Sequence, residues 1–519
     1  MNRHRTNHHR TVGLRVVLTA ACLAVLVPLS GCVTLFLPPA PSLTSTPTDE
    51  EVPEDLQPFY GQILHWSKCE GMFQCATATA PMDWSDPSRA SIDIALIRAT
   101  ATGEAKGSLL VNPGGPGGSG YDFIRDSLSY AVDSKLNEHF DIVGFDPRGV
   151  NNSSAVKCYS DPVEMDAFLF DIPPNPVGSD AWIDDIERSN AEFGAACLTY
   201  TGELLGFVDT VSAARDLDLL RAILGDEKLN YLGYSYGTFL GATYADLFPA
   251  KTGRLVLDGA VDPATTDFEV TKTQAMGFEN AARAYLAVCL ADSECPFRGT
   301  VDSAMDRIRA LLDRLDASPL RATDGRMLGS AVMFNAIILP LYSESNWPYL
   351  SDLFTDVIQG NADYAFQLAD AYYGRNSDGT YADNSTEAFI AINCLDYVST
   401  STRDTLRAEA AELAKAAPTF GPQMSFGGTS CDQWPFEATR VRQPIRAPGS
   451  APILVLGTTN DPATPYEWAV NLAGQLENGH LVTYHGEGHT AYNKSNACVN
   501  RVVDDFLVDG TVPNADPQC

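Results

Sequence analysis

The sequence predicts a doubly wound α/β fold in which a mostly parallel sheet is interrupted by a long helical segment. Short apolar runs that suit buried strands alternate with helical stretches over residues 56–262 and again over 446–519. Residues 263–445 instead show helical periodicity, which is clearest at Val301, Met305, Ile308, Leu312 and Leu315. We therefore expect one α/β domain, made of residues 56–262 and 446–519, split around a helical cap of residues 263–445.

The expected strands are short and end at turn residues. Residues 91–98 (SIDIALIR) alternate polar and apolar positions, as a half-buried strand does. Residues 108–112 (SLLVN) and 140–145 (FDIVGF) are short apolar runs that suit buried strands. A helix is expected over 210–224, because apolar residues recur there at helical spacing and Gly225 follows as a stop. The remaining strands are expected at 228–233, 254–257, 452–457 and 480–484.

The charge balance excludes one large class of partner. The chain has 519 residues with 35 Lys and Arg against 66 Asp and Glu, a net charge of −31. A protein that binds nucleic acid needs a basic footprint for the phosphates, so nucleic-acid binding is not expected. The acidity itself identifies no partner and fits a well-solvated surface.

The first 31 residues have the pattern of a secretory signal. Four arginines precede an apolar run over residues 16–29, which is too short for a comfortable membrane span. The run ends in Leu-Ser-Gly before Cys32, which resembles the bacterial lipobox, where the signal is cut before the cysteine and the thiol is acylated. We expect a lipoprotein anchored through Cys32 to the outer face of the cell membrane. An ordinary signal cleaved nearby is the alternative.

Residues 32–55 are predicted to be a flexible tether. The stretch is rich in Pro, Ser, Thr and acidic residues, which cannot bury a core. Without residues 1–31 the net charge becomes −35, because the signal carries four arginines and no acid.

Ten cysteines remain after the signal and Cys32 are set aside, and an even number in an exported chain indicates disulfides. Sequence alone does not fix the pairing. Pairing of neighbours is our hypothesis: Cys69–Cys75, Cys158–Cys197, Cys289–Cys295, Cys394–Cys431 and Cys498–Cys519. Zinc binding is the competing use of cysteine, but no CxxC pair occurs, so no metal is expected.

A candidate nucleophile lies between an expected strand and an expected helix. Residues 233–237 (GYSYG) fit the G-x-S-x-G pattern of a nucleophile elbow, a sharp turn that exposes the serine hydroxyl at a helix N-terminus. The strand-turn-helix context makes the short motif informative. Ser235 is therefore the expected nucleophile.

A serine nucleophile needs a base and an acid, which follow it in the chain order Ser, acid, His in folds with this elbow. His489 is the expected base, because it lies in a loop beyond the last strand, and His485 is the alternative. Asp461 follows the preceding strand and is the expected acid that orients the imidazole. Asp258 is the rival acid. Thr464 lies three residues beyond Asp461 and either hydrogen-bonds its loop or caps the next helix.

A glycine-rich loop is expected to supply part of an oxyanion hole. Residues 112–120 (NPGGPGGSG) follow a strand, and glycines let backbone N–H groups approach a reacting atom closely. Gly115 and Tyr236 are the expected donors. A phosphate-binding loop is the alternative, but the Gly-Lys-Ser/Thr ending is missing. The Asp-Pro-Arg of residues 146–148 is interpreted as an ionic brace for this loop.

These motifs together resemble the actinobacterial tripeptidyl aminopeptidase-like branch of the α/β-hydrolases. The resemblance covers nearly all of residues 60–519, and NPGGPG is similar to the HGGPG of prolyl iminopeptidases, with Pro113 in the place of their His. It implies an α/β-hydrolase fold with a helical cap, and an exported serine exopeptidase that acts at free peptide N-termini. Hydrolysis of this kind needs no cofactor.

The resemblance also implies a site for the α-ammonium group of the peptide. Asp396 is the candidate carboxylate, because the neighbouring cysteine could hold it rigid. A carboxylesterase or lipase with the same triad is the alternative function, and a surface lipoprotein that binds peptides without cleaving them is a third. The sequence predicts no oligomeric state.

Overall fold

The computed structural model describes residues 43–399 and 401–519. The predicted signal, Cys32 and the first part of the predicted tether lie outside the described residues, so their roles stay predictions. Within the described chain, every helix is too short or too polar to span a membrane.

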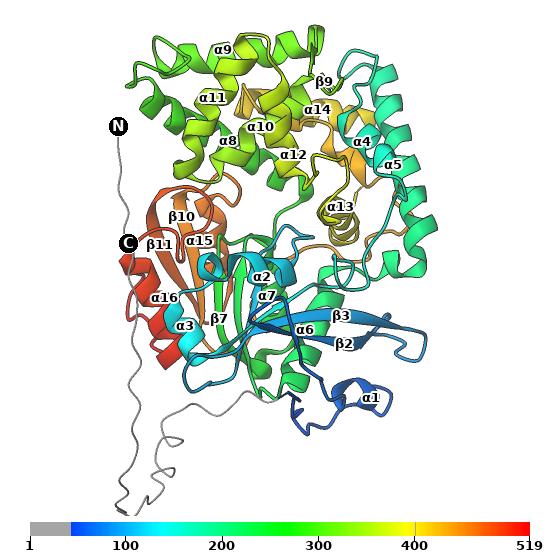
Figure 1. The fold of residues 1–519 in the computed structure, drawn as a ribbon, viewed down its shortest axis with the longest axis vertical. Coiled ribbons are helices and arrows are strands. Elements are labelled where there is room, and N and C mark those ends of the chain that lie inside the picture. The colour runs from blue at the N-terminus through cyan, green and yellow to red at the C-terminus, as the bar shows by residue number, and fades with distance from the viewer. Residues whose placement is uncertain (1–42, 400) are drawn as a thin grey trace, which may run out of the picture. The chain divides into compact units, whose positions relative to one another are not determined.

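A nine-stranded sheet forms the centre of the described chain (Figure 1), with the strand order β1-β2-β3-β5-β4-β6-β7-β10-β11. The six strands from β5 to β11 in this order are parallel, whereas β1, β2 and β3 pair antiparallel at one side. Every strand expected from residue 91 onward is present. The strands are β1 (Ser67–Cys69), β2 (Phe73–Pro81), β3 (Ser91–Ala99), β4 (Ser108–Asn112), β5 (Asp141–Phe145), β6 (Leu229–Tyr234), β7 (Thr252–Asp258), β10 (Ile453–Asn460) and β11 (Gly479–Glu487).

Helices cover both faces of this sheet, as the predicted doubly wound α/β-hydrolase fold requires. Leu109 and Val111 of β4 pack with one set of helices and Leu110 with the other, because alternate side chains of a strand point to opposite faces. One face carries α2 (Gly120–Ala131), α3 (Ser134–His139) and α16 (Ala497–Asp509); the other carries α6 (Thr210–Leu224), α7 (Tyr236–Leu247) and α15 (Tyr466–Gln475). The short helix α1 (Gln57–Tyr60) precedes the sheet and packs on α6.

The segment between β7 and β10 is mainly helical, with one two-stranded hairpin of β8 (Leu320–Arg321) and β9 (Met327–Leu328). Helices α8 to α12 bury a separate apolar cluster that includes Phe278, Leu312 and Met333. Figure 1 shows these helices beyond the carboxyl ends of the parallel strands. The helices are α8 (Asp267–Cys289), α9 (Val301–Ala317), α10 (Ser330–Leu341), α11 (Trp347–Ile358), α12 (Asp363–Tyr372), α13 (Ser385–Asp396) and α14 (Arg403–Ala416).

Helix α13 packs with the sheet domain rather than with the cap helices. Its side chains Ala388, Ala391 and Ile392 belong to the apolar cluster of α6 and α7. The sequence placed α13 in the cap because helical periodicity shows that a helix has an apolar face, but not what covers that face.

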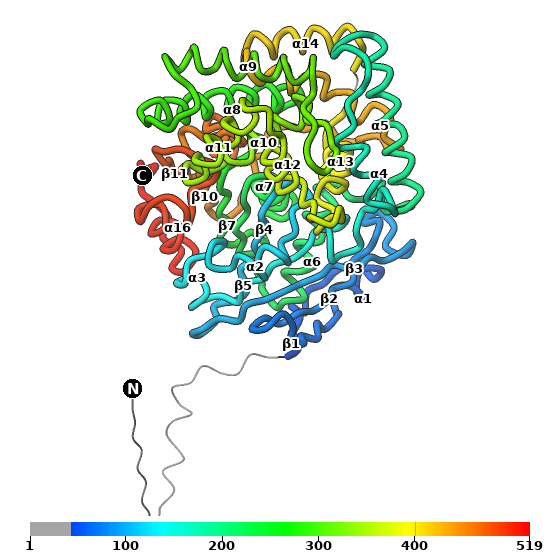
Figure 2. The backbone as a smooth tube through the Cα atoms, turned by 45° about the horizontal axis from the view of Figure 1, so that its top comes forward, coloured from blue at the N-terminus to red at the C-terminus, as the bar shows by residue number. Residues whose placement is uncertain are grey.

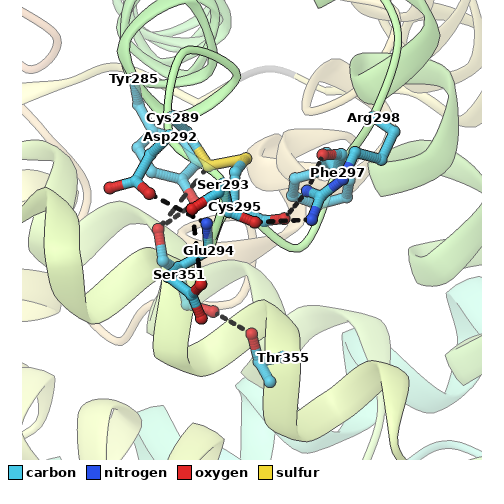
Figure 3. Close-up of a disulfide and its surroundings, with 10 residues drawn as sticks. All are labelled: Tyr285, Cys289, Asp292, Ser293, Glu294, Cys295, Phe297, Arg298, Ser351 and Thr355. Atoms are coloured by element: carbon cyan, nitrogen blue, oxygen red, sulfur yellow. Dashed lines mark hydrogen bonds between the residues drawn. A yellow bond between two sulfur atoms is a disulfide. The ribbon is translucent and has the colours of Figure 1, made fainter.

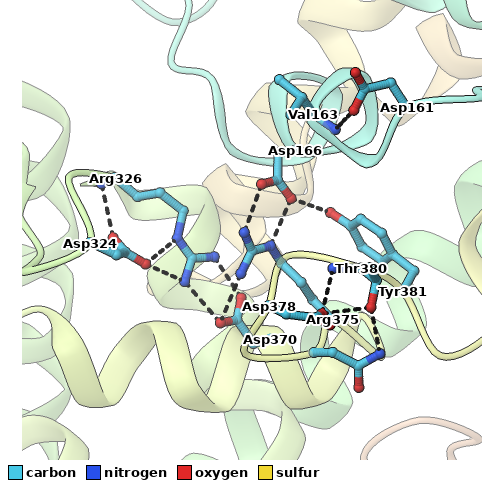
Figure 4. A network of polar contacts seen from close by, with 11 residues as sticks. Asp161, Val163, Asp166, Asp324, Arg326, Asp370, Arg375, Asp378, Thr380 and Tyr381 are labelled. Carbon is cyan, nitrogen blue, oxygen red and sulfur yellow. Dashed lines mark hydrogen bonds and ion pairs between the residues drawn. The ribbon is translucent and has the colours of Figure 1, made fainter.

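Two helices that the sequence placed in the sheet domain are tied to the cap segment. These are α4 (Pro162–Phe170) and α5 (Asp180–Thr201), which both views show beside α12 and α13 (Figures 1 and 2). Asp166 of α4 accepts two hydrogen bonds of 2.7 Å from Arg375, as Figure 4 shows. Arg403 of α14 binds the carboxylate of Glu187 on α5 at 2.9 Å.

All five predicted disulfides are present with the predicted partners. Cys394–Cys431 lies beside the end of α13, and Cys498–Cys519 ties the last residues to α16. Figure 3 shows Cys289–Cys295, which closes a short loop at the end of α8.

The described part of the predicted tether is packed, so the prediction of a flexible segment over residues 32–55 is wrong for residues 43–55. Thr48 donates its N–H to the carbonyl of Ala222 at 2.8 Å. The Glu50 carboxylate binds Lys251 and, at 2.5 Å, the guanidinium of Arg221, whose side chain is fully buried. Composition could not reveal this contact, because it depends on one acid meeting one buried cation.

We predict that Glu50→Gln lowers the free energy of unfolding by about 2 kcal/mol, since a buried cation then loses one of its charged partners. Asp218 still binds Arg221 at 2.8 Å, so the fold should persist. Glu51→Gln is the matched control, because Glu51 is exposed, and it should change the free energy by less than about 0.5 kcal/mol. Denaturant unfolding of both variants gives the comparison; equal stabilities would show that the contact with Glu50 is not stabilising.

Four carboxyl groups whose pKa is raised by burial predict that the protein is more stable at pH 5 than at pH 8. Burial raises the pKa of Asp226 and Asp504 to about 6, and of Glu387 and Asp396 to about 7. A carboxyl whose pKa is raised by folding favours the folded state below its unfolded value near 4, and this contribution is lost as pH rises through 6 to 7. The thermal midpoint should therefore be lower at pH 8 than at pH 5, and Asp226→Asn should make this difference smaller. A midpoint that rises over this range would contradict the prediction.

Candidate active site

Ser235 lies on a sharp turn between β6 and α7, as the elbow motif predicts. Its backbone has φ 54° and ψ −125°, a conformation that is strained for any residue other than glycine. A Cβ added to Gly233 would lie 2.4 Å from the carbonyl oxygen of Gly237. A side chain at Gly237 would lie 2.7 Å from Oδ1 of Asn112. The turn therefore requires small residues on both sides of the serine.

The strained turn is held by neighbouring backbone. The N–H of Ser235 donates to the carbonyl oxygen of Asp258 at 2.9 Å. The carbonyl oxygen of Ser235 accepts hydrogen bonds from the N–H of Thr238 at 2.9 Å and from the Thr238 hydroxyl at 2.6 Å. Within the described residues the serine hydroxyl makes no hydrogen bond, including none to Nε2 of His489, although a nucleophile of this kind depends on contact with its base.

His489 and Asp461 meet at the carboxyl edge of the sheet. Nδ1 of His489 lies 2.9 and 3.0 Å from the two carboxylate oxygens of Asp461. Asp461 is buried and also accepts backbone N–H groups from Ala463 and Thr464 at 2.9 and 2.8 Å. A carboxylate is only an acceptor, so this contact places the proton on Nδ1 and leaves Nε2 as the basic nitrogen.

The same edge brings this pair next to the serine turn. A Cβ added to Gly259 would lie 3.3 Å from Cε1 of His489, and the adjacent Asp258 holds the N–H of Ser235. Ser235, Asp461 and His489 therefore come from the ends of β6, β10 and β11 to one place, where ligands bind in open α/β sheets.

The two rival residues have other contacts. Asp258 is fully buried and accepts the N–H groups of Ala491 at 2.9 Å and Tyr492 at 2.7 Å, so it braces the loop behind His489 rather than the imidazole. Burial raises the pKa of the Asp258 carboxyl. His485 is exposed, and its Nε2 lies 2.8 Å from Oε1 of Gln518, near the C-terminus.

Thr464 contacts both partners of the acid–base pair. Its hydroxyl donates to Oδ2 of Asp461 at 3.0 Å and lies 3.2 Å from Nδ1 of His489. Of the two sequence interpretations, a bond to the Asp461 loop is therefore the one that the structure shows; α15 has no side-chain cap.

We predict that Thr464→Val lowers kcat about 5- to 20-fold with little change in KM. Asp461 then loses a hydrogen-bond donor, and Nδ1 of His489 loses its contact with the Thr464 hydroxyl. Thr464→Ser keeps the hydroxyl and should retain at least half of the activity. Steady-state kinetics of the two variants make the comparison, and equal activities would show that the hydroxyl does not matter.

The glycine loop lies directly against the serine turn. A Cβ added to Gly114 would lie 2.9 Å from Cβ of Ser235 and 3.0 Å from the backbone N of Tyr236. The N–H groups of Gly115 and Tyr236 donate no hydrogen bond within residues 43–399 and 401–519, which leaves both available to an oxyanion.

The predicted ionic brace of this loop is only half present. Asp146 accepts the hydroxyl of Ser119 at 2.6 Å and the N–H of Tyr121 at 3.0 Å, so it fixes the end of the glycine loop. Arg148 instead forms a bidentate pair with Asp216 of α6, at 2.7 Å for both contacts. It braces the sheet domain and does not touch the loop.

The cap contributes a contact that the sequence did not reveal. The carbonyl oxygen of Tyr342, at the end of α10, accepts the N–H of His489 at 2.8 Å. The two rings lie 5.4 Å apart between centroids. No sequence signal marks Tyr342, because the bond uses its backbone.

The structure does not favour Asp396 as the α-ammonium site. Its two oxygens accept the N–H and the hydroxyl of Thr210, at 3.0 and 2.5 Å. It lines a cavity of about 140 Å³ that also holds Asp209, Asp246, Arg440 and Arg442, so the lining does not single out Asp396 for an ammonium group. Burial raises the pKa of Asp396 to about 7, so the carboxyl is only partly charged at neutral pH.

The arrangement is suited to acyl transfer. It presents a hydroxyl on a strained turn, a histidine held in one tautomer by a carboxylate, and two unpaired backbone donors. In the described residues, no cluster of three His, Cys, Asp or Glu side chains is placed to hold a metal ion.

Comparison with known proteins agrees with this chemistry. The family model described as TAP-like protein matches residues 417–519. Serine protease Hip1 of Mycobacterium tuberculosis (strain ATCC 25618 / H37Rv) is 36% identical over 489 residues, covering 89% of this chain and 92% of that protein. Carboxylesterase B of the same organism is 36% identical over 509 residues, with 95% and 96% covered. Tripeptidyl aminopeptidase of Streptomyces lividans is 31% identical over 471 residues, with 88% and 86% covered. The chain therefore belongs to the tripeptidyl aminopeptidase-like family of serine α/β-hydrolases.

Proposed function

We propose that this chain is an exported serine peptidase that releases short peptides from free N-termini, as a tripeptidyl aminopeptidase does. One observation carries the proposal: the Asp461–His489 pair lies beside the strained turn of Ser235. The choice of peptides as substrate is supported by the 31% identity to a protein named tripeptidyl aminopeptidase over 88% of this chain.

In the proposed reaction Ser235 attacks the scissile carbonyl carbon while its proton passes to Nε2 of His489. Asp461 keeps the Nδ1 proton in place and stabilises the imidazolium that forms. The N–H groups of Gly115 and Tyr236 bind the oxyanion. His489 then protonates the leaving amine as the C–N bond breaks, which leaves the peptide acyl group on Ser235. Water attacks this ester with His489 as base and restores the serine.

A matched pair of substrates tests the proposal. A tripeptide amide with a free N-terminus should be cleaved, and its N-acetylated twin should be cleaved at least about 100-fold more slowly, because the enzyme must recognise the ammonium group. Equal cleavage of the two would contradict an aminopeptidase. A peptide-library digest read by mass spectrometry would then report how many residues are released in each step.

Ester hydrolysis is the second candidate function, and the similarity to a protein named carboxylesterase B over 95% of this chain favours it. The same triad would serve both reactions. A kcat/KM for short acyl esters far above that for every free-amine peptide amide, with no effect of N-acetylation, would identify the esterase.

We propose further that the enzyme is held at the outer face of the membrane by lipid on Cys32. The support is the basic and apolar leader that ends in Leu-Ser-Gly-Cys. Cells fed a labelled fatty acid should label the wild type and not Cys32→Ala. Equal labelling of both proteins would contradict the anchor.

A further inference from the structure

The first turn of helix α13 contacts the glycine loop of residues 112–120. A Cβ added to Gly117 would lie 2.6 Å from the carbonyl oxygen of Ser385 and 2.9 Å from the N of Phe389, so loop and helix touch through their backbones. Just before the helix, Asn384 donates to the carbonyl oxygens of Gly149 and Val156 at 2.9 and 2.7 Å. This end of α13 is therefore fixed to the sheet domain beside the loop that holds Gly115.

The other end of α13 reaches the second oxyanion donor through a chain of hydrogen bonds. Asp396, its last residue, accepts the N–H of Thr210 at 3.0 Å and the hydroxyl of Thr210 at 2.5 Å. The Thr210 oxygen also contacts the phenol of Tyr236. A hydroxyl has one proton, so when the Asp396 carboxylate is ionised and takes the proton of Thr210, the phenol donates to Thr210. Both Thr210 and Tyr236 are buried.

The backbone of Tyr236 needs such a support. It is the first residue of α7 and follows Ser235, whose φ of 54° persists only if the surroundings fix it. Asp258 and Thr238 hold the serine itself. The phenol is the polar end of the Tyr236 side chain, and its bond to Thr210 at the start of α6 holds Tyr236 in place. A shift of Tyr236 would move the N–H away from the place where the oxyanion forms.

We propose that Asp396 and Thr210 are positioning residues for the oxyanion donor Tyr236, and that α13 thereby orders both halves of the oxyanion hole. Neither residue contacts the substrate in this role. The inference rests on the proposed acyl-transfer mechanism at Ser235, but not on whether the substrate is a peptide or an ester.

The test interrupts the hydrogen bonds from Asp396 to Tyr236 at two places. Thr210→Val deletes the bridging hydroxyl with little change of shape, and Tyr236→Phe deletes the phenol oxygen from the other side. Each should lower kcat for a short acyl p-nitrophenyl ester about tenfold or more, with KM within about twofold, because a donor used in the transition state is misplaced. The rate constant for labelling by a fluorophosphonate should fall by a similar factor. Thr210→Ser should restore both rates to within about threefold of wild type.

The double variant separates positioning from general damage. If the two groups act through one chain, Thr210→Val/Tyr236→Phe should lose no more than either single variant. Thermal midpoints report whether each variant folds, and Tyr236→Phe keeps the test valid if Thr210→Val does not fold.

Two different results would overturn two different claims. A labelled wild type together with a folded Tyr236→Phe that keeps the wild-type kcat and labelling rate would overturn the positioning role alone. A wild type that neither hydrolyses esters or peptides nor reacts with the fluorophosphonate would overturn the proposed function, and the inference with it.

Discussion

Ser235→Ala is expected to lower kcat/KM for a cleaved peptide by at least about 10⁴-fold, since it removes the atom that forms the acyl-enzyme. The fold should be unaffected, because the serine hydroxyl makes no hydrogen bond in the described chain and alanine fills the same turn. Steady-state kinetics on a tripeptide amide, with the thermal midpoint as a check of folding, give the measurement.

The matched control for this variant is Ser88→Ala, at an exposed position in the loop before β3. It should keep the wild-type rate. Substantial turnover by Ser235→Ala would mean that another group is the nucleophile, and the assignment of the turn would then be wrong.

Asp461→Asn should lower kcat by about 10⁴-fold, because an amide does not select the tautomer that leaves Nε2 of His489 basic. The amide oxygen can still accept the N–H groups of Ala463 and Thr464, but the NH₂ cannot accept the N–H of Thr490 that Oδ2 accepts at 3.1 Å, so some loss of stability is also expected. Measurement of kcat and of denaturant unfolding on the same preparation separates these effects.

Asp258→Asn gives the contrast that identifies the acid. Asp258 accepts the backbone N–H groups of Ala491 and Tyr492, and the oxygen of an asparagine at the Oδ2 position can still accept both. Asp258→Asn should therefore keep most of the wild-type kcat, whereas Asp461→Asn should not. If Asp258→Asn were the inactive variant and Asp461→Asn the active one, the two assignments would have to be exchanged.

The positions of most strands along the chain and the elbow could be predicted from the sequence because they depend on local patterns. Alternation and apolar runs before turn residues predicted β3 and the later strands of the nine-stranded sheet, but not the hairpin of β8 and β9, and G-x-S-x-G predicted the strained turn. The antiparallel strands β1 and β2 were missed, although residues 76–80 alternate Ala and Thr, because these small side chains give only a weak apolar signal. The pairing of cysteines with their neighbours was also correct.

Contacts between distant parts of the chain could not be predicted in the same way. Asp396 was singled out as a carboxylate near a cysteine, but its partner Thr210 is 186 residues away. Tyr342 reaches His489 through a backbone oxygen, which no side-chain pattern reports. Glu50 was expected in a flexible segment and instead binds a buried arginine. In each case the role is set by a tertiary neighbour rather than by the residue's own surroundings in sequence.

Ser235 is the proposed covalent nucleophile of this serine hydrolase. The most direct measurement is to react the folded protein with a fluorophosphonate and locate the adduct by peptide mass mapping. We expect a single adduct on Ser235 in the wild type and none in Ser235→Ala. No adduct, or an adduct on another residue that persists in Ser235→Ala, would contradict it.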